Sequence, residues 1–250
     1  MSWTAQNIVI QTKNKTLLNI NEIRLPENQI TAIIGANGAG KSTLLKALRG
    51  LYAHIAPQFN GQSVKEMTAH GKIAYVGQHE GFNTPLSVLE YVLLGRFPHL
   101  SWFAKPKIQN IENARKILSD YELAHLADNP IQTLSGGEKQ RAAIVRALMQ
   151  ETAVICLDEP CNHLDIRHQH KLMNDLQKRK QNNNLTTIIV LHDLNLAAYY
   201  ADFIVLLDNG KLNANGTPDE VMTNEILSNA YRWQIDVAEY KNHKIYLSVA

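Results

Sequence analysis

Hydrophobic residues occur in two kinds of pattern along this chain of 250 residues. Short, continuous apolar runs are typical of the buried central strands of a parallel sheet, and they occur at residues 153–157, 186–191 and 203–207. Shorter β-rich segments predict three further strands, at residues 7–10, 29–34 and 72–76, with a turn at residues 26–28.

Helical spacing of apolar residues predicts helices at residues 42–51, 134–150 and 167–180. The last of these is expected to end in the basic run 178–180, where cations favour the helix dipole, and to be followed by a polar turn at 181–184. A helix start is also predicted at Thr217, because Pro218 follows it and Glu220 completes a capping-box pattern. Residues 234–250 alternate as a hairpin does.

Strands that alternate with helices predict an α/β fold with a mainly parallel sheet, preceded here by an antiparallel β portion at the N-terminus. Residues 85–130 differ, because they carry helical periodicity around an irregular stretch at 97–102. We interpret them as a helical subdomain inserted into the core. The predicted organisation is one domain over residues 1–250, with residues 1–84 and 131–250 forming the α/β core.

Composition narrows the classes of function. A formal net charge of +2 predicts no nucleic-acid partner, and the histidine spacing around His168 and His170 fits no zinc site. The only two cysteines, Cys156 and Cys161, exclude a disulfide framework and favour a reducing compartment. No signal-peptide pattern is found, and no apolar run reaches the roughly 18 residues of a spanning helix, so any membrane association is expected through a partner.

A glycine-rich loop follows the strand at residues 29–34 and precedes a helix. Residues 35–42, GANGAGKS, match the phosphate-loop pattern G-x-x-x-x-G-K-[ST] at every fixed position. Backbone N–H groups of such a loop surround a β-phosphate, Lys41 reaches the β- and γ-phosphates, and the Ser42 hydroxyl ligates Mg²⁺. A plain glycine turn would not require Lys-Ser after the glycines. The predicted nucleotide-binding residues here are Gly35, Asn37, Gly38, Ala39, Gly40, Lys41, Ser42 and Thr43.

Two carboxylates follow the apolar run at residues 153–157. The carboxyl edge of a parallel sheet is where ligands bind, so Asp158 and Glu159 are predicted to lie near the loop. Asp158 suits the coordination sphere of Mg²⁺, and Glu159 suits a general base that polarises the attacking water. The alternative is a pair of solvated acids in a turn.

Another helix start is predicted at Ser135, Gly136, Gly137 and Glu138, and it has two compatible interpretations. The first is a capping box, in which Ser135 and Glu138 satisfy free N–H groups. The second is a second phosphate contact, because two glycines in a first turn each cost about 1 kcal/mol relative to alanine and leave the helix N-terminus bare.

The order of motifs along essentially the whole chain resembles that of ABC-transporter ATPases. The motifs are the phosphate loop, Gln78, the Leu-Ser-Gly-Gly-Glu segment 134–138, Asp158-Glu159, Leu164-Asp165 and His192. The resemblance implies a P-loop NTPase core, with ATP and Mg²⁺ as cofactors. It implies a head-to-tail dimer of two copies, in which each ATP lies between one phosphate loop and the partner's Ser135, Gly136 and Gly137. Gln78 would contact Mg²⁺ and the attacking water, Asp165 would act across the dimer interface, and His192 would hold the γ-phosphate.

Residues 94–99, 164–169 and 192–197 resemble more closely the ATPases of iron-siderophore, haem and vitamin B12 importers. This resemblance implies transmembrane permease subunits and, indirectly, an extracytoplasmic substrate-binding protein as partners, and a peripheral place on the cytoplasmic face of the inner membrane. Trp102 and Phe103 would lie where such proteins contact the permease, or belong to the core. The alternatives are an exporter ATPase and a non-transport ATPase of the same family.

The chain departs from the family pattern at one position. An aromatic residue often precedes the second strand in this family and stacks on adenine, and the aligned residue here is Thr12. Base stacking is therefore expected to be weaker or to come from elsewhere.

Overall fold

A six-stranded sheet forms the centre of the computed structural model, which describes residues 2–13, 15–78, 81–82, 84–100, 104–241 and 243–249. Its strand order is β10-β9-β3-β8-β7-β6; β9, β3, β8, β7 and β6 pair in parallel and β10 pairs antiparallel with β9. The prediction of a mainly parallel α/β sheet is confirmed. The strands are β3 (Ile30–Ile34), β6 (Ile73–Val76), β7 (Val154–Asp158), β8 (Thr186–Val190), β9 (Phe203–Asp208) and β10 (Lys211–Gly216).

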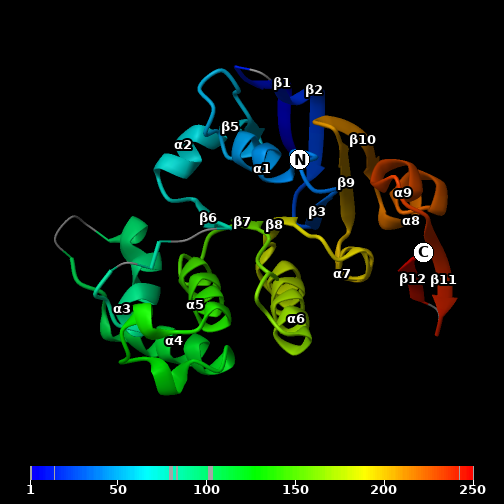
Figure 1. Ribbon diagram of the computed structural model, residues 1–250. Coiled ribbons are helices and arrows are strands. Elements are labelled where there is room, and N and C mark those ends of the chain that lie inside the picture. Colours follow the sequence, from blue (N-terminus) through cyan, green and yellow to red (C-terminus); the bar gives the residue numbers. More distant parts are fainter. Residues whose placement is uncertain are drawn as a thin grey trace.

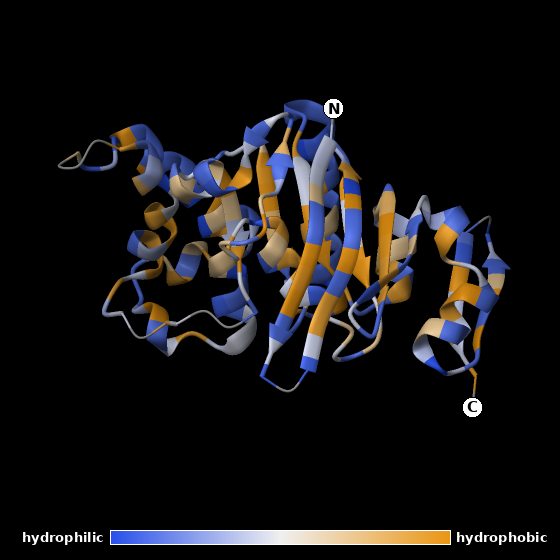
Figure 2. Cartoon of the chain, turned by 90° about the horizontal axis from the view of Figure 1, so that it is seen from above, coloured by the Kyte–Doolittle hydropathy of each residue, from blue (hydrophilic) through white to orange (hydrophobic). Residues whose placement is uncertain are grey.

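An antiparallel sheet of order β2-β1-β4-β5 lies at the N-terminal side. The predicted antiparallel β portion is confirmed, and it is larger than the strand predicted at residues 7–10. Strand β1 (Ser2–Thr12) pairs along its length with β2 (Lys15–Pro26), and two short strands, β4 (Gln58–Phe59) and β5 (Gln62–Ser63), extend the sheet. The sequence pattern missed β2, because two consecutive exposed polar residues, Asn21 and Glu22, interrupt its alternation of buried and exposed positions. Figure 2 shows this alternation along the strands beside the N-terminus.

Helix α1 (Lys41–Leu48) lies between the two sheets. Its buried Leu44, Leu45 and Leu48 pack in one core with apolar residues of β1 and β2 and with one face of β3, β7, β8 and β9. On the opposite face of the parallel sheet, α5 (Gly136–Leu148), α6 (Ile166–Asn183) and α7 (Leu194–Tyr200) cover a second core (Figure 1). The parallel sheet is therefore covered on both faces, as its continuous apolar strands require.

The helical insertion contains α3 (Val88–Leu93), a 3₁₀-helix at Leu94–His99, α4 (Ile108–Asp120) and a short 3₁₀ turn at Ala124–Leu126. Its entry and exit lie side by side: the Val88 N–H donates to the Asn129 carbonyl, and the Ile131 N–H donates to the Leu86 carbonyl. We propose residues 85–130 as its bounds on this contact. Helix α5 follows the exit and packs against both α3 and α4. Trp102 and Phe103 lie outside the described residues.

Several predicted boundaries are corrected. The polar segment 181–184 was predicted as a turn, but its first three residues belong to α6. The helix continues to Asn183 and ends where Asn184 adopts a left-handed conformation (φ 53°). Short elements that the pattern did not predict are α2 (Val64–Ala69), α7, β10 and α9 (Asn224–Tyr231).

The C-terminal part of the chain begins with α8 (Pro218–Val221) and ends in the predicted hairpin, β11 (Ile235–Tyr240) and β12 (His243–Ser248). The capping box at Thr217 is confirmed. This part lies at the end of the molecule opposite the helical insertion (Figure 1). Across the described residues, every helix is too short or too polar to cross a membrane.

Candidate functional site

The phosphate loop connects β3 to α1 and has the conformation that its glycines allow. Gly35, Gly38 and Gly40 have φ values of 145°, 78° and 103°, a region that other residues rarely adopt. A Cβ atom at Gly35 would meet the Leu207 carbonyl oxygen at 2.3 Å, and one at Gly40 would meet the Leu18 side chain at 2.7 Å. The glycines therefore serve close packing of the chain as well as the shape of the loop.

A cavity of about 450 Å³ opens above this loop. Six residues of the predicted loop line it, and Gln78 and Glu159 join them from other elements. Gly35 and Ala39 are buried instead of lining it. The loop residues that line the cavity are Asn37, Gly38, Gly40, Lys41, Ser42 and Thr43.

The opposite wall of the cavity was missed by sequence reasoning. It consists of Lys15, Thr16 and Leu17 at the start of β2, with Asn209 and Gly210 from the β9–β10 turn. Two backbone bonds hold this wall in place: the Gly210 N–H donates to the Ala39 carbonyl at 3.0 Å, and the Asn19 N–H donates to the Gly210 carbonyl at 2.8 Å. No sequence signal identifies these residues, because their place depends on how β2 packs.

Thr12 is not among the residues that line the cavity. It lies at the end of β1, where its hydroxyl donates to the Lys15 carbonyl at 3.1 Å. The described residues that line the cavity include no aromatic side chain.

Lys41 is folded back onto its own loop. Its Nζ donates to the Gly35 carbonyl at 2.8 Å and to the Ala36 carbonyl at 3.1 Å. Burial lowers the pKa of Lys41, and the carboxylates of Glu159 and Asp158 oppose that effect. A bound polyphosphate would stabilise the charged ammonium in the same way, so the side chain suits an anionic ligand.

Ser42 and Asp158 meet at the edge of the parallel sheet. The Ser42 hydroxyl donates to Asp158 Oδ1 at 2.8 Å, and Asp158 is 2% exposed. Burial raises the pKa of Asp158, the bond from Ser42 opposes this, and the charge of Glu159 adds to it. A buried carboxylate whose charged form is disfavoured gains stability from a cation. Hard oxygen donors of this kind suit Mg²⁺, so the residues fit the metal that the sequence predicted.

Glu159 is the centre of a polar cluster from three segments. Its Oε2 accepts from Gln78 Nε2 and from Asn162 Nδ2, each at 2.8 Å, and its Oε1 lies 2.7 Å from His192 Nε2. Gln78 follows β6 and His192 follows β8, so three strand ends bring these groups together. Asn162 was not predicted, although it lies three residues after Glu159.

Glu159 and Asp158 are not a pair of solvated turn acids. The Glu159 side chain is 9% exposed, and its backbone has φ 51°, which is uncommon for a residue other than glycine. Such backbone strain is concentrated at functional sites, where the surrounding structure holds it. His192 is 40% exposed, so it joins the buried carboxylate to the solvent side of the cluster.

The capping box at Ser135 is confirmed. The Glu138 carboxylate accepts from the Ser135 N–H at 2.8 Å and from its hydroxyl at 2.7 Å, and these bonds lower the pKa of Glu138. Glu138 is therefore engaged in holding Ser135. The two glycines differ: a Cβ at Gly137 would meet the His163 carbonyl at 2.8 Å, whereas one at Gly136 would meet nothing within 4 Å. Only Gly136 leaves open space in front of the helix.

Asp165 begins α6 as its N-cap. Its Oδ1 accepts from the His168 backbone N–H at 2.8 Å and also lies 2.8 Å from His168 Nδ1. These bonds lower the pKa of Asp165, while its side chain stays 66% exposed. Neither Asp165 nor the segment 135–138 lines the cavity above the phosphate loop within this chain. The predicted residues thus form one cluster around the cavity and one separate exposed surface.

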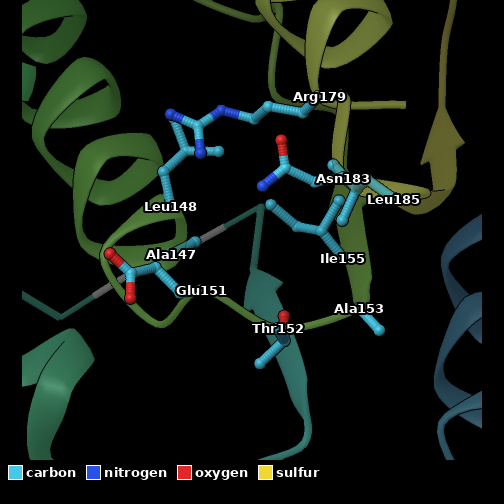
Figure 3. Close-up of a pocket in the computed structure, with 9 residues that line it drawn as sticks. All are labelled: Ala147, Leu148, Glu151, Thr152, Ala153, Ile155, Arg179, Asn183 and Leu185. Carbon is cyan, nitrogen blue, oxygen red and sulfur yellow. The ribbon is translucent and has the colours of Figure 1, made fainter. Parts of the chain in front are cut away.

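A second pocket, of about 280 Å³, lies at the other end of β7 between α5 and α6 (Figure 3). Figure 3 shows the Arg179 guanidinium and the Asn183 amide over an apolar floor that includes Ile155 and Leu185. It contains none of the predicted site residues, and it lies at the amino end of the strand whose carboxyl end carries Asp158. We therefore place the functional site at the phosphate loop.

Residues 18–162 match the family model described as ABC transporter. The ferric enterobactin transport ATP-binding protein FepC of Escherichia coli is 37% identical over 84% of this chain and 79% of its own length. The hemin import ATP-binding protein HmuV of Photobacterium damsela subsp. piscicida is 37% identical over 96% of this chain and 92% of its own length.

Solved structures show the same fold. A metal-chelate type ABC transporter in an inward-facing conformation superposes with a TM-score of 0.81 at 28% identity, over 100% of this chain and 98% of that one. An ATP-binding cassette solved as a dimer in a post-hydrolysis state with ADP and Pi gives a TM-score of 0.75 at 27% identity, over 86% of this chain and 98% of that one.

Proposed function

This chain belongs to the ABC transporter family and is an ATPase of that type, and we propose that it drives an importer of iron complexes. The observation that carries the catalytic part is the cluster around Glu159. A buried carboxylate there lies between Gln78 and His192, next to a cavity that the phosphate loop forms.

The proposed chemistry follows from this geometry. Backbone N–H groups of the loop and the Lys41 ammonium hold the phosphates of ATP, and Glu159 accepts a proton from the attacking water. His192 Nε2 now bonds to Glu159, and we propose that it turns to the γ-phosphate when ATP is bound. Gln78 and Asn162 fix the orientation of the Glu159 carboxylate.

Ser42, Asp158 and Gln78 are the side chains that would hold Mg²⁺. When bound, Mg²⁺ neutralises charge that develops on the phosphate oxygens. The short bond between the Ser42 hydroxyl and Asp158 already brings two oxygen donors together, and Gln78 lines the same cavity.

The exposed Ser135 surface supports a dimer in which it meets ATP held by a second copy. The Ser135 side chain is held by Glu138, and open space lies in front of Gly136. A helix N-terminus with these properties suits a phosphate. We propose that Ser135, Gly136 and Gly137 contact ATP on the partner, that Glu138 positions Ser135, and that Asp165 faces the partner as well.

The dimer can be tested in a chain that binds ATP without hydrolysing it. In a Glu159→Gln background, we expect ATP to convert the monomer into a dimer, as measured by size-exclusion chromatography with light scattering. Adding Ser135→Arg should prevent this dimer, because the long cation blocks the phosphate position, while ATP affinity of the monomer changes less than about threefold.

Ser87→Arg is the matched control for that experiment. Ser87 also forms a capping box, with Glu90 at the start of α3, so its replacement has a similar effect on helix stability. A dimer that persists with Ser135→Arg, or is lost equally with Ser87→Arg, contradicts the proposed role of the Ser135 surface.

The cargo is proposed from the relatives named for ferric enterobactin and hemin. The ATPase subunit lies on the cytoplasmic side of the membrane in this proposal, bound to permease subunits, and an extracytoplasmic binding protein delivers the iron complex. An exporter and a vitamin B12 importer are the alternatives that the test must separate.

We expect ferric enterobactin or hemin, with its binding protein, to stimulate ATP turnover of the chain reconstituted with its permease in vesicles. Cobalamin serves as the matched probe and should leave turnover unchanged. The same vesicles with the Glu159→Gln chain, which does not hydrolyse ATP, show how much of the uptake of the iron complex depends on hydrolysis. Stimulation by cobalamin alone would overturn the proposed cargo, and transport of the iron complex only away from the cytoplasmic side would overturn import. Neither result would contradict the ATPase activity.

A further inference from the structure

The backbone of Gly35 is held from two sides. Gly35 is buried, its φ of 145° excludes a side chain, and a Cβ would collide with the Leu207 carbonyl. Its carbonyl accepts from Lys41 Nζ at 2.8 Å. Its N–H donates to the hydroxyl of Tyr231 at 3.0 Å, a residue 196 positions further along the chain.

Tyr231 is the last residue of α9, and α9 is anchored firmly. Leu227 and Ala230 bury one face of the helix, and α9 packs beside β9. The next residue, Arg232, caps the helix in a left-handed conformation, and its guanidinium lies 3.6 Å from the Asp208 carboxylate at the end of β9. The position of the tyrosine hydroxyl is therefore set by packing.

The hydroxyl of Tyr231 keeps one charge state over the physiological range. Burial raises its pKa to about 12, and the bond from the Gly35 N–H lowers it. The neutral hydroxyl thus remains an acceptor for Gly35 wherever the enzyme works. The family model ends at residue 162, so the C-terminal part that supplies this contact lies beyond the matched segment.

We propose that Tyr231 is a positioning residue for ATP: its hydroxyl fixes the Gly35 peptide and thereby the shape of the phosphate loop and the place of Lys41. This inference rests on the proposed binding of ATP at the loop. Through it, the C-terminal part of the chain takes part in nucleotide binding without touching the nucleotide.

Loss of the hydroxyl should weaken binding more than chemistry. Without ATP, the loop of a Tyr231→Phe chain can relax until the Gly35 N–H finds another partner. With ATP, the loop must take the shape that fits the phosphates, and the N–H stays buried and unpaired. The penalty therefore falls on the bound state. Glu159 and His192 are unchanged, so turnover at saturating ATP should persist.

The experiment compares Tyr231→Phe with Tyr246→Phe in the full-length chain. Steady-state ATP hydrolysis and calorimetric ATP binding are measured for each variant. Tyr246 is a buried tyrosine of the same C-terminal part, on β12. For Tyr231→Phe we expect KM and Kd for ATP to rise about tenfold with kcat within about twofold. For Tyr246→Phe we expect all three to remain at wild-type values.

Three results decide the matter. Unchanged KM and Kd in Tyr231→Phe would overturn the positioning role. Equal losses in both variants, or a fall in kcat that tracks a fall in Tm, would show a general structural role instead. If the wild-type chain itself bound no ATP, the proposed function would fail and this inference with it. Unchanged KM and Kd in Tyr231→Phe beside normal ATP binding by the wild-type chain would overturn the inference alone, so the two failures are distinguishable.

Discussion

Replacing Glu159 by glutamine is expected to slow ATP hydrolysis by about 10²–10⁴-fold, the usual contribution of a general base. The substitution preserves the shape of the cluster. A glutamine oxygen can still accept from Gln78 and Asn162, and its amide N–H can donate to His192 Nε2 once that ring carries its proton on Nδ1. Only the capacity to accept a proton from water is lost, so ATP affinity should change by less than about threefold.

Single-turnover hydrolysis and calorimetric ATP binding measure the two effects separately. Glu112→Gln is the matched control, because it makes the same chemical change at an exposed position of α4. Wild-type turnover in Glu159→Gln would remove Glu159 as the general base. A parallel loss of ATP binding would show instead that the carboxylate holds the site together.

Lys41→Ala is expected to weaken ATP binding about 100-fold, because a charge-assisted bond to phosphate contributes up to about 3 kcal/mol. The structure adds a second effect. Lys41 donates to the carbonyls of Gly35 and Ala36, so its removal also leaves two loop carbonyls without that donor. We expect the loop to lose both its cation and part of its internal support.

Calorimetric titration with ATP measures this loss, and Lys65→Ala, on the exposed side of α2, removes the same charge as a control. Affinity near that of the wild-type chain in Lys41→Ala would refute the assignment. Thermal unfolding of both variants separates the two effects: a lower Tm in Lys41→Ala alone would report the loss of internal support in the loop.

Much of the fold could be predicted because its strands are buried on both faces. Strands β3, β7, β8 and β9 are buried along nearly their whole length and are rich in apolar residues, and such segments are hard to mistake. Strand β2 was missed because Asn21 and Glu22 interrupt its alternation of buried and exposed positions. Helix α6 was predicted to end three residues too early, since a polar sequence continues a helix as readily as a turn until Asn184 stops it.

The site divides in the same way. The phosphate loop, the acidic pair and the Ser135 helix start could each be predicted, because the residues of each motif are adjacent in the sequence. Gln78 and His192 were found only through the family resemblance, and the structure brings both to Glu159. Lys15 and Tyr231 gave no signal in the sequence, because the packing of distant segments brings them to the site. Asn162 was not predicted either, although it lies only three residues after the Glu159 carboxylate that it contacts.

The sequence by itself therefore determined which chemical groups this protein carries and that its central sheet is mainly parallel, because local motifs and apolar runs are properties of short segments. Only the tertiary structure decided which of these groups meet. Strand order brings the ends of β6, β7 and β8 together around Glu159, and the packing of α9 carries Tyr231 to Gly35. Contacts between distant segments depend on the packing of whole elements, and no short segment of sequence records that packing.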